Sequence, residues 1–225
     1  AYKIENWMQV GSDIDGEAAG DQSGWSVSIS NDGSVVAVGA VNNDDNGESS
    51  GHVRIYQNDN GIWTQIGDDI DGEAAGDQSG FSVSLSSDGT IVAISGYGND
   101  ENGDNSGHVR IYQYANDSWN QIGDDIDGEA TGDRSGYSVS LSSDGSSVAI
   151  SAIYNADNGY FSGHVRIYQY ANGSWTQIGD DINGEARGDE SGRSVSLSSD
   201  GSVVAIGAYG NDGNGNKSGH VRIYQ

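Results

Sequence analysis

The sequence predicts an all-β protein, a β-propeller of four four-stranded antiparallel blades, and three observations lead to this fold class. The chain divides into four units of equal length, because Trp7, Trp63, Trp119 and Trp175 recur at a constant spacing of 56. Each unit contains short segments in which apolar and small polar residues alternate with period two, as in strands with one buried face. No segment has the 3.6-residue periodicity of an amphipathic helix. Short, repeated, antiparallel strands without helices are typical of propeller blades.

The repeat keeps its register without insertion or deletion. The units that begin at Trp63 and Trp119 agree at 42 of 56 positions, so they are expected to fold alike. A repeat of this kind buries its apolar face only against its neighbours. We therefore expect one domain over residues 1–225, with repeats at about 1–57, 58–113, 114–169 and 170–225.

Each unit is expected to form four strands, and the second unit shows them most clearly. Residues 82–86 alternate serine with apolar residues, and residues 91–95 form a continuous apolar run that suits a strand covered on both faces. Asp88-Gly89 favours a hairpin turn between them, because glycine accepts a positive φ. The other two strands are expected at 63–67 and 108–112, with polar loops at 68–79 and 98–105.

The first predicted strand, around Trp7, has no partner close to it in the sequence. We expect it to close the ring by pairing with the last strand, residues 220–224, because this pairing removes two exposed sheet edges. The alternative is pairing with the last strand of another molecule, which gives a swapped dimer or a fibre. The sequence leaves both forms of closure open.

Charge and composition exclude several classes of function. With 34 acidic and 9 basic side chains, the formal net charge is −25, which opposes binding to nucleic acid and to anionic membrane surfaces. No apolar stretch approaches the roughly 20 residues of a membrane span, so direct membrane insertion is not expected. Cysteine is absent, which excludes disulfides and thiolate catalysis.

The loop between consecutive units is strongly acidic, with five carboxylates among residues 67–77. Two interpretations stay open: a solvated acidic turn, or a weak calcium site, since carboxylate oxygens are the ligands that calcium prefers. Calcium is the one cofactor this pattern suggests. The candidate ligands are Asp13, Asp15, Glu17, Asp69, Asp71, Glu73, Asp125, Asp127, Glu129, Asp181 and Glu185.

No enzyme signature is present in the sequence. A catalytic site needs unlike groups in one pocket, whereas nearly every polar group here recurs at equivalent positions of the four units. The four histidines share one repeat position and are expected to be structural. The arginines two residues later are expected to pair with a loop carboxylate and fix that loop. We therefore expect no catalytic residues and no enzymatic activity.

The start of the innermost strand breaks the symmetry of the repeat. Trp25, Phe81 and Tyr137 occupy this position in three units, and Arg193 replaces them in the fourth. These four residues mark a candidate binding face, although ordinary drift between repeats is the stronger explanation of the replacement. Three Asn-x-Ser sequons permit N-glycosylation in a secretory eukaryote. They begin at Asn116, Asn172 and Asn216.

Each unit resembles an FG-GAP repeat, the blade of the integrin alpha-subunit propeller, in the tryptophan-containing variant of bacterial and algal proteins. The resemblance rests on Gly20-Asp21, Ser26-Val27, Val38-Gly39-Ala40 and residues 51–56, with their counterparts in the other units. It implies an extracellular or cell-surface protein that binds protein or glycan. The family's calcium loop, Asp-x-Asp-x-Asp-Gly, is reduced here to Asn31-Asp32-Gly33, so that calcium site is not carried over.

Two functions follow as expectations. The first is a non-catalytic extracellular scaffold for adhesion or binding, whose partner is a protein or a glycan and whose binding a cation assists. The alternative is a structural subunit of an extracellular fibre or surface layer, whose partners are copies of itself joined through propeller contacts or swapped strands. The uniformity of the repeats favours the alternative, because recognition generally diversifies loops.

Overall fold

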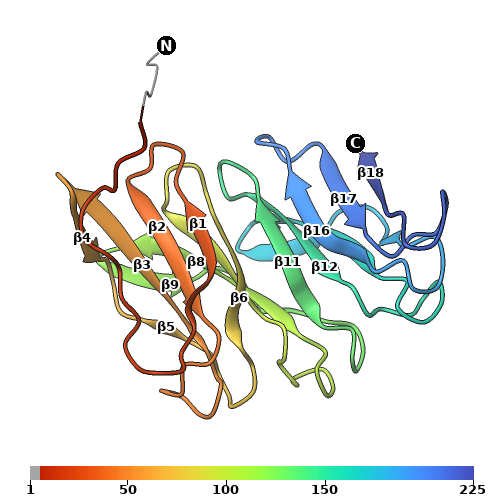
Figure 1. The fold of residues 1–225 in the computed structure, drawn as a ribbon, viewed down its shortest axis with the longest axis horizontal. Helices are drawn as coiled ribbons and strands as arrows, with labels where there is room; N and C mark the ends of the chain where they lie inside the picture. The colour runs from red at the N-terminus through yellow and green to blue at the C-terminus, as the bar shows by residue number, and fades with distance from the viewer. Residues whose placement is uncertain (1–5) are drawn as a thin grey trace.

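The computed structural model describes residues 6–225, and within this range every regular element is a β-strand. The strands form four sheets that follow one another in chain order from the left to the right of Figure 1. No helix able to cross a membrane occurs in the part of the chain that the structure describes. The predicted all-β class is confirmed.

Three sheets have four main strands and a short fifth strand. The first sheet has the order β1-β2-β3-β4, and the two-residue β5 pairs with β3. Its strands are β1 (Ser23–Ile29), β2 (Val35–Ala40), β3 (His52–Asp59), β4 (Ile62–Gln65) and β5 (Ile70–Asp71). The second sheet repeats this order with β6 (Ser79–Leu85), β7 (Ile91–Gly96), β8 (His108–Ala115), β9 (Ser118–Gln121) and β10 (Ile126–Asp127). The third repeats it with β11 (Ser135–Leu141), β12 (Ser147–Ala152), β13 (His164–Ala171), β14 (Ser174–Gln177) and β15 (Ile182–Asn183).

The fourth sheet has only three strands, in the order β16-β17-β18. They are β16 (Ser191–Leu197), β17 (Val204–Ala208) and β18 (His220–Tyr224). We call the four sheets blades 1 to 4. Four-stranded antiparallel blades are thus confirmed for blades 1 to 3, whereas blade 4 lacks its outermost strand.

The core lies between consecutive blades. Val53 and Ile55 of β3 pack with Val83 and Leu85 of β6, and all four side chains are buried. The alternating serines of the inner strands serve the same interface: Leu85 N donates to Ser28 Oγ at 2.9 Å, and this bond recurs between the later blades. Each blade therefore buries its apolar residues only against its neighbours, as the repeat predicts.

The Ser-Asp-Gly turns form the expected hairpins between the two inner strands. In blade 3, Gly145 has a φ of +70°, and Asp144 Oδ1 accepts hydrogen bonds from Ser142 Oγ, Ser146 N and Ser146 Oγ. One oxygen of the carboxylate thus holds the turn together through three hydrogen bonds. This explains why a single carboxylate at this position suffices without the calcium loop of the integrin-type repeat.

The predicted closure of the ring is not confirmed. Among the described residues, β18 pairs with β17 alone, and residues 6–22 form no strand. The predicted strand around Trp7 is therefore wrong for the single chain. The physical reason is that blades 1 and 4 lie at opposite ends of the row (Figure 1), so the edge of β18 is not beside the N-terminal segment.

The turn carboxylates give a pH-dependent contribution to stability. Hydrogen bonds from Ser146 and Ser142 lower the pKa of Asp144 below its usual 3.8. A depressed carboxyl pKa contributes stability that is present above the unfolded pKa and is lost as the pH falls through the folded one. We expect Asp144→Ala to lower Tm by about 2–4 °C at pH 7. Thermal unfolding scans should show this difference shrinking as the pH falls below about 4; an equal difference at pH 7 and pH 2 would contradict the assignment.

Candidate functional site

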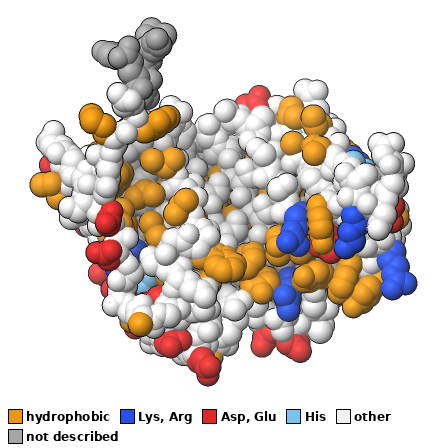
Figure 2. All heavy atoms as spheres, viewed as in Figure 1, with side chains coloured by type: hydrophobic (Ala, Val, Ile, Leu, Met, Phe, Trp, Pro, Cys, Tyr) orange, Lys and Arg blue, Asp and Glu red, His pale blue; other side chains and the backbone are white. Residues whose placement is uncertain are grey.

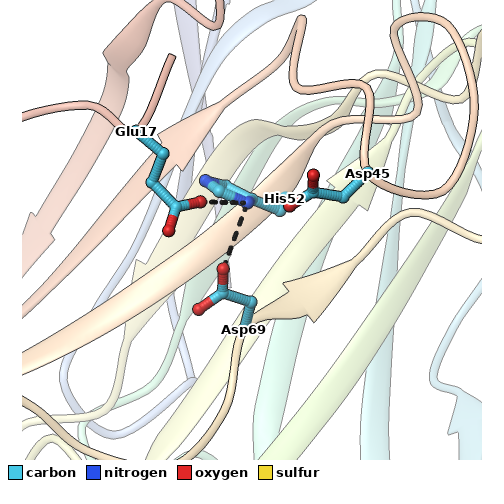
Figure 3. Close-up of side chains that lie close together, drawn as sticks. All are labelled: Glu17, Asp45, His52 and Asp69. Atoms are coloured by element: carbon cyan, nitrogen blue, oxygen red, sulfur yellow. Dashed lines mark ion pairs between the residues drawn. The ribbon is translucent and has the colours of Figure 1, made fainter.

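A cluster of one histidine and three carboxylates recurs in blades 1 to 3. In blade 1, His52 at the start of β3 faces Glu17, Asp45 and Asp69, which approach it from three directions (Figure 3). The donor atoms of these four residues lie within 4.8 Å of one another. The equivalent clusters are Glu73, Glu101, His108 and Asp125 in blade 2, and Glu129, Asp157, His164 and Asp181 in blade 3.

Three different loops supply the carboxylates of each cluster. For His108, Glu73 comes from the loop that enters blade 2, Glu101 from the loop between β7 and β8, and Asp125 from the loop that leaves blade 2. His108 Nδ1 lies 3.7 Å from Glu73 Oε2 and 3.4 Å from Asp125 Oδ2. The cluster therefore joins the two interblade loops at the end of a central strand.

The histidines of these clusters are almost completely buried, and Nδ1 of His52, His108 and His164 has no hydrogen-bond partner. Burial lowers the pKa of His164 to about 4, with Arg166 acting in the same direction. The imidazole is then neutral at physiological pH. A neutral ring whose unpartnered nitrogen faces carboxylates can bind a cation, which would also satisfy the buried polar atom.

The arginine of each blade holds the loop glutamate in place. Arg110 Nη1 lies 3.5 Å from Glu73 Oε1, and its Nη2 donates to the carbonyl oxygen of Asp71. Burial raises the pKa of Glu73 above its usual value, because the arginine only partly offsets the loss of water. The predicted role of these arginines, pairing with a loop carboxylate, is confirmed.

The structure distributes the predicted metal ligands over several places. Glu17 and Asp69 meet at His52, Glu73 and Asp125 at His108, and Glu129 and Asp181 at His164. Carboxylates of one loop thus do not converge: Asp69 and Glu73, four residues apart, belong to neighbouring clusters.

The remaining predicted ligands lie outside these clusters. Asp71 and Asp127 lie on the short strands that pair with β3 and β8. Asp13 accepts a hydrogen bond from Gln9 Nε2 at 2.8 Å, and the carbonyl oxygen of Asp15 accepts one from Arg54. Glu185 lies beside His220, 3.6 Å from its Nδ1.

Sequence reasoning missed the histidines, together with Asp45, Glu101 and Asp157. A signal was present, because each histidine precedes a carboxylate of the next loop at a constant spacing. The pairs are His52 with Asp69, His108 with Asp125, and His164 with Asp181. What the sequence does not show is that three loops meet at the same strand end. The three sequons lie in exposed turns, at Asn116, Asn172 and Asn216.

The four residues of the predicted binding face form one row across the inner strands. The ring centroids of Trp25 and Phe81 are 5.7 Å apart, and those of Phe81 and Tyr137 are 5.2 Å apart. The Arg193 guanidinium lies 5.1 Å from the Tyr137 ring centroid. The row crosses β1, β6, β11 and β16 and so joins all four blades.

The row continues onto the neighbouring loops as a surface rich in aromatic and cationic side chains. Tyr97 stacks on Phe81 at 4.0 Å, and Arg134 lies over both Tyr97 and Tyr154. We call this surface the aromatic-cationic face. It consists of Trp25, Phe81, Tyr97, Arg134, Tyr137, Tyr154, Tyr160, Phe161, Arg187, Arg193, Tyr209 and Lys217.

The cations of the chain fall into two groups. Of nine Lys and Arg residues, the four arginines of β3, β8, β13 and β18 pair with loop glutamates, and each also lies over the tyrosine two residues later in its own strand. Lys3 lies outside the described residues, and the other four all lie over tyrosines of the aromatic-cationic face. Among these four, Arg193 also pairs with Glu190 at 3.2 Å.

Figure 2 shows this second group of cations among hydrophobic side chains on the right-hand part of the molecule. A hollow of about 430 Å³ opens beside Arg134, Tyr154 and Phe161, and Asp104 also lines it. The face therefore combines aromatic rings, positive charge and a recess on one side of the row of blades.

Comparison with known families supports the sequence interpretation. The model of the FG-GAP repeat matches residues 13–56 and 183–224, so the chain carries FG-GAP repeats. No curated protein sequence matches the chain significantly.

Several solved structures share the arrangement of sheets. The chain is similar to a hydrazine synthase of Kuenenia stuttgartiensis, with a TM-score of 0.55 and 13% identity over 94% of this chain and 49% of that one. It is also similar to a periplasmic gluconolactonase of Pseudomonas aeruginosa, with a TM-score of 0.50 and 18% identity over 89% of this chain and 56% of that one. At these identities the likeness shows a propeller-like fold alone. The chain spans about half the length of these two chains.

Proposed function

We propose that this chain, which carries FG-GAP repeats, is a non-catalytic extracellular scaffold that binds an acidic polysaccharide through the aromatic-cationic face. One observation carries the proposal. On a chain with a net charge of −25, the four described cations outside the central strands all lie over aromatic rings of one surface.

The chemistry of this face suits a sugar that carries negative charge. Exposed aromatic rings stack on the apolar faces of pyranose rings, and arginine pairs with carboxylate or sulfate through two parallel hydrogen bonds. The row from Trp25 to Arg193 is long enough to cross all four blades, so it offers several successive contacts to an extended chain. The hollow beside Arg134 offers room for one sugar unit.

The proposal assigns binding and not catalysis to the scaffold, because its histidines and carboxylates occur in equivalent copies. His52, His108 and His164 have the same partners in each blade, so no acid, base or nucleophile is singled out. The FG-GAP repeats support an extracellular location, since such repeats are typical of extracellular proteins.

Calorimetric titration with polygalacturonate, using neutral dextran for comparison, tests the binding face. We expect polygalacturonate to bind and Arg193→Gln to weaken it about tenfold, equivalent to about 1.4 kcal/mol. Thr176→Ala, on the outer strand β14, is the matched control and should leave the affinity unchanged. Absence of polygalacturonate binding, or equal affinity for dextran, would contradict the proposal.

The second part of the proposal concerns the histidine clusters, each of which we expect to hold one divalent transition-metal ion. The donor set of one imidazole nitrogen and three carboxylates suits Zn²⁺ or Mn²⁺, whereas calcium takes six to eight oxygens. The bound ion would neutralise carboxylates of two interblade loops and so fix both loops to the blade. Zinc or manganese thus replaces calcium as the expected cation.

Metal binding is tested by titrating the chain with Zn²⁺ and following heat and Tm. Each saturated site contributes about 2.7 kcal/mol at a hundredfold excess over Kd, which raises Tm by about 5 °C or more. EDTA should reverse the increase. His108→Gln should lower the stoichiometry by one ion per chain, whereas Asp117→Asn, in an exposed turn, should not. Unchanged stoichiometry in His108→Gln would show that zinc binds elsewhere.

A structural subunit is the second candidate function. The observation that favours it is that apolar side chains remain exposed on both end blades, among them Val27 and Ile223. Filaments that bind no polysaccharide would support this role over the scaffold.

A further inference from the structure

The two ends of the row of blades expose apolar faces that elsewhere in the chain pack against each other. On blade 1, the side chain of Val27 is 65% exposed, whereas its counterpart Val83 on blade 2 is 8% exposed against blade 1. On blade 4, Ile223 is 70% exposed, whereas its counterpart Ile55 on blade 1 is 1% exposed against blade 2. The exposed faces of blade 1 and blade 4 are therefore equivalent to the two faces that pack against each other between blades 1 and 2.

The same incompleteness affects the tryptophans. Trp119 packs at Gly67, and its indole Nε1 donates to the carbonyl oxygen of Ile66 at 2.8 Å. Trp63 and Trp175 make the same contact one repeat earlier and later. The next such position, at Ile178 and Gly179, has no side chain near the glycine, and a cavity of about 360 Å³ opens there. Trp7, the matching tryptophan, is 90% exposed.

The N-terminal segment, residues 7–16, already has the contacts of an outer strand. Gln9 bonds to Asp13 as Gln65 bonds to Asp69. The carbonyl oxygens of Val10 and Asp15 accept from Trp63 and Arg54 of blade 1, as their counterparts accept from blade 2. The segment therefore resembles the outer strand of a blade, but it pairs with no inner strands in its own chain. Blade 4 has the three inner strands and lacks only the outer one.

We infer that a second copy of this chain covers both ends. Residues 7–16 of one copy complete blade 4 of the other, and blade 1 of the first packs on blade 4 of the second. In blade 1, β3 pairs with β4 and β5 in a fixed register. The same register in the completed blade 4 places Gln9 opposite Tyr224 and Ile14 opposite Val221. The indole of Trp7 then fills the cavity at Gly179. This docking changes no contact that either copy already makes.

Closure within one chain is disfavoured by the three interfaces that the structure contains. They use equivalent residues, so they fix nearly the same angle between blades, and four blades at that angle leave both end faces exposed. The chain also superposes on about half of longer propeller-like chains. Two copies joined end to end at both junctions make a ring of eight blades.

The second copy also adds a carboxylate beside His220 of blade 4, although Gly213 stands there in place of the carboxylate that Asp45 supplies in blade 1. His220 and Glu185 lie 3.6 Å apart and correspond to His52 and Glu17 of blade 1, where Asp69 supplies a further carboxylate. By periodicity, Asp13 of the second copy takes that place. This one point rests on the proposed metal binding, whereas the joining of the ends does not.

Light scattering of the purified chain tests the inference through its mass in solution. We expect twice the 23.4 kDa of the single chain. Val27→Asp and Ile223→Asp should each give a folded particle of one chain, because both side chains are exposed in the single copy. Their Tm should lie below that of the wild-type dimer, because the stabilisation by association is lost. Mixing the two variants should restore the double mass, since each retains the end that the other has lost. Tyr160→Asp is the matched control: it alters an equally accessible side chain away from both ends, and the second repeat has Asp104 there.

Several outcomes would overturn the inference. A wild-type chain of single mass that tolerates Ile223→Asp would show that the ends stay uncovered. A wild-type chain of single mass whose Tm falls in the Ile223→Asp variant would show closure within one chain. A mass of three or more copies would exclude the ring of two, and failure of the mixture to reassociate would exclude end-to-end joining.

Discussion

The packing of Val53 and Ile55 of one blade against Val83 and Leu85 of the next is the interaction on which the rest of the structure depends. A single sheet of short strands cannot bury enough apolar surface to be stable alone, so each blade needs a neighbour on both faces. Repetition of the interface once in every unit fixes the angle between blades, brings the interblade loops to the strand ends and lines up the inner strands. It also leaves two faces uncovered at the ends.

Both candidate sites follow from this repetition and differ in how they use it. The histidine clusters are repeated faithfully, because each joins the two interblade loops to a central strand and so supports the interface itself. The aromatic-cationic face lies where the copies diverge, as Arg193 replaces the aromatic residues found in the other blades. Positions that repeat unchanged thus serve the architecture, and positions that vary offer chemistry for recognition.

Much of the fold could be predicted from the sequence, because strand alternation, Asp-Gly turns and an unbroken repeat are local signals. The role of the arginines, each of which pairs with a loop carboxylate, was accessible in the same way. The ligand clusters were not, since Asp69 and Glu73 are close in sequence yet turn toward different histidines. The strand around Trp7 could not be placed either, because its formation depends on a neighbouring edge that the single chain does not supply.

The main claim is that the interface repeated between blades also joins the end blades of two copies. Small-angle X-ray scattering of the chain in solution tests this claim most directly. The account predicts the pair-distance distribution of a closed ring that contains two copies, with the end faces no longer accessible. A scattering curve that fits a single open row of four blades would contradict it.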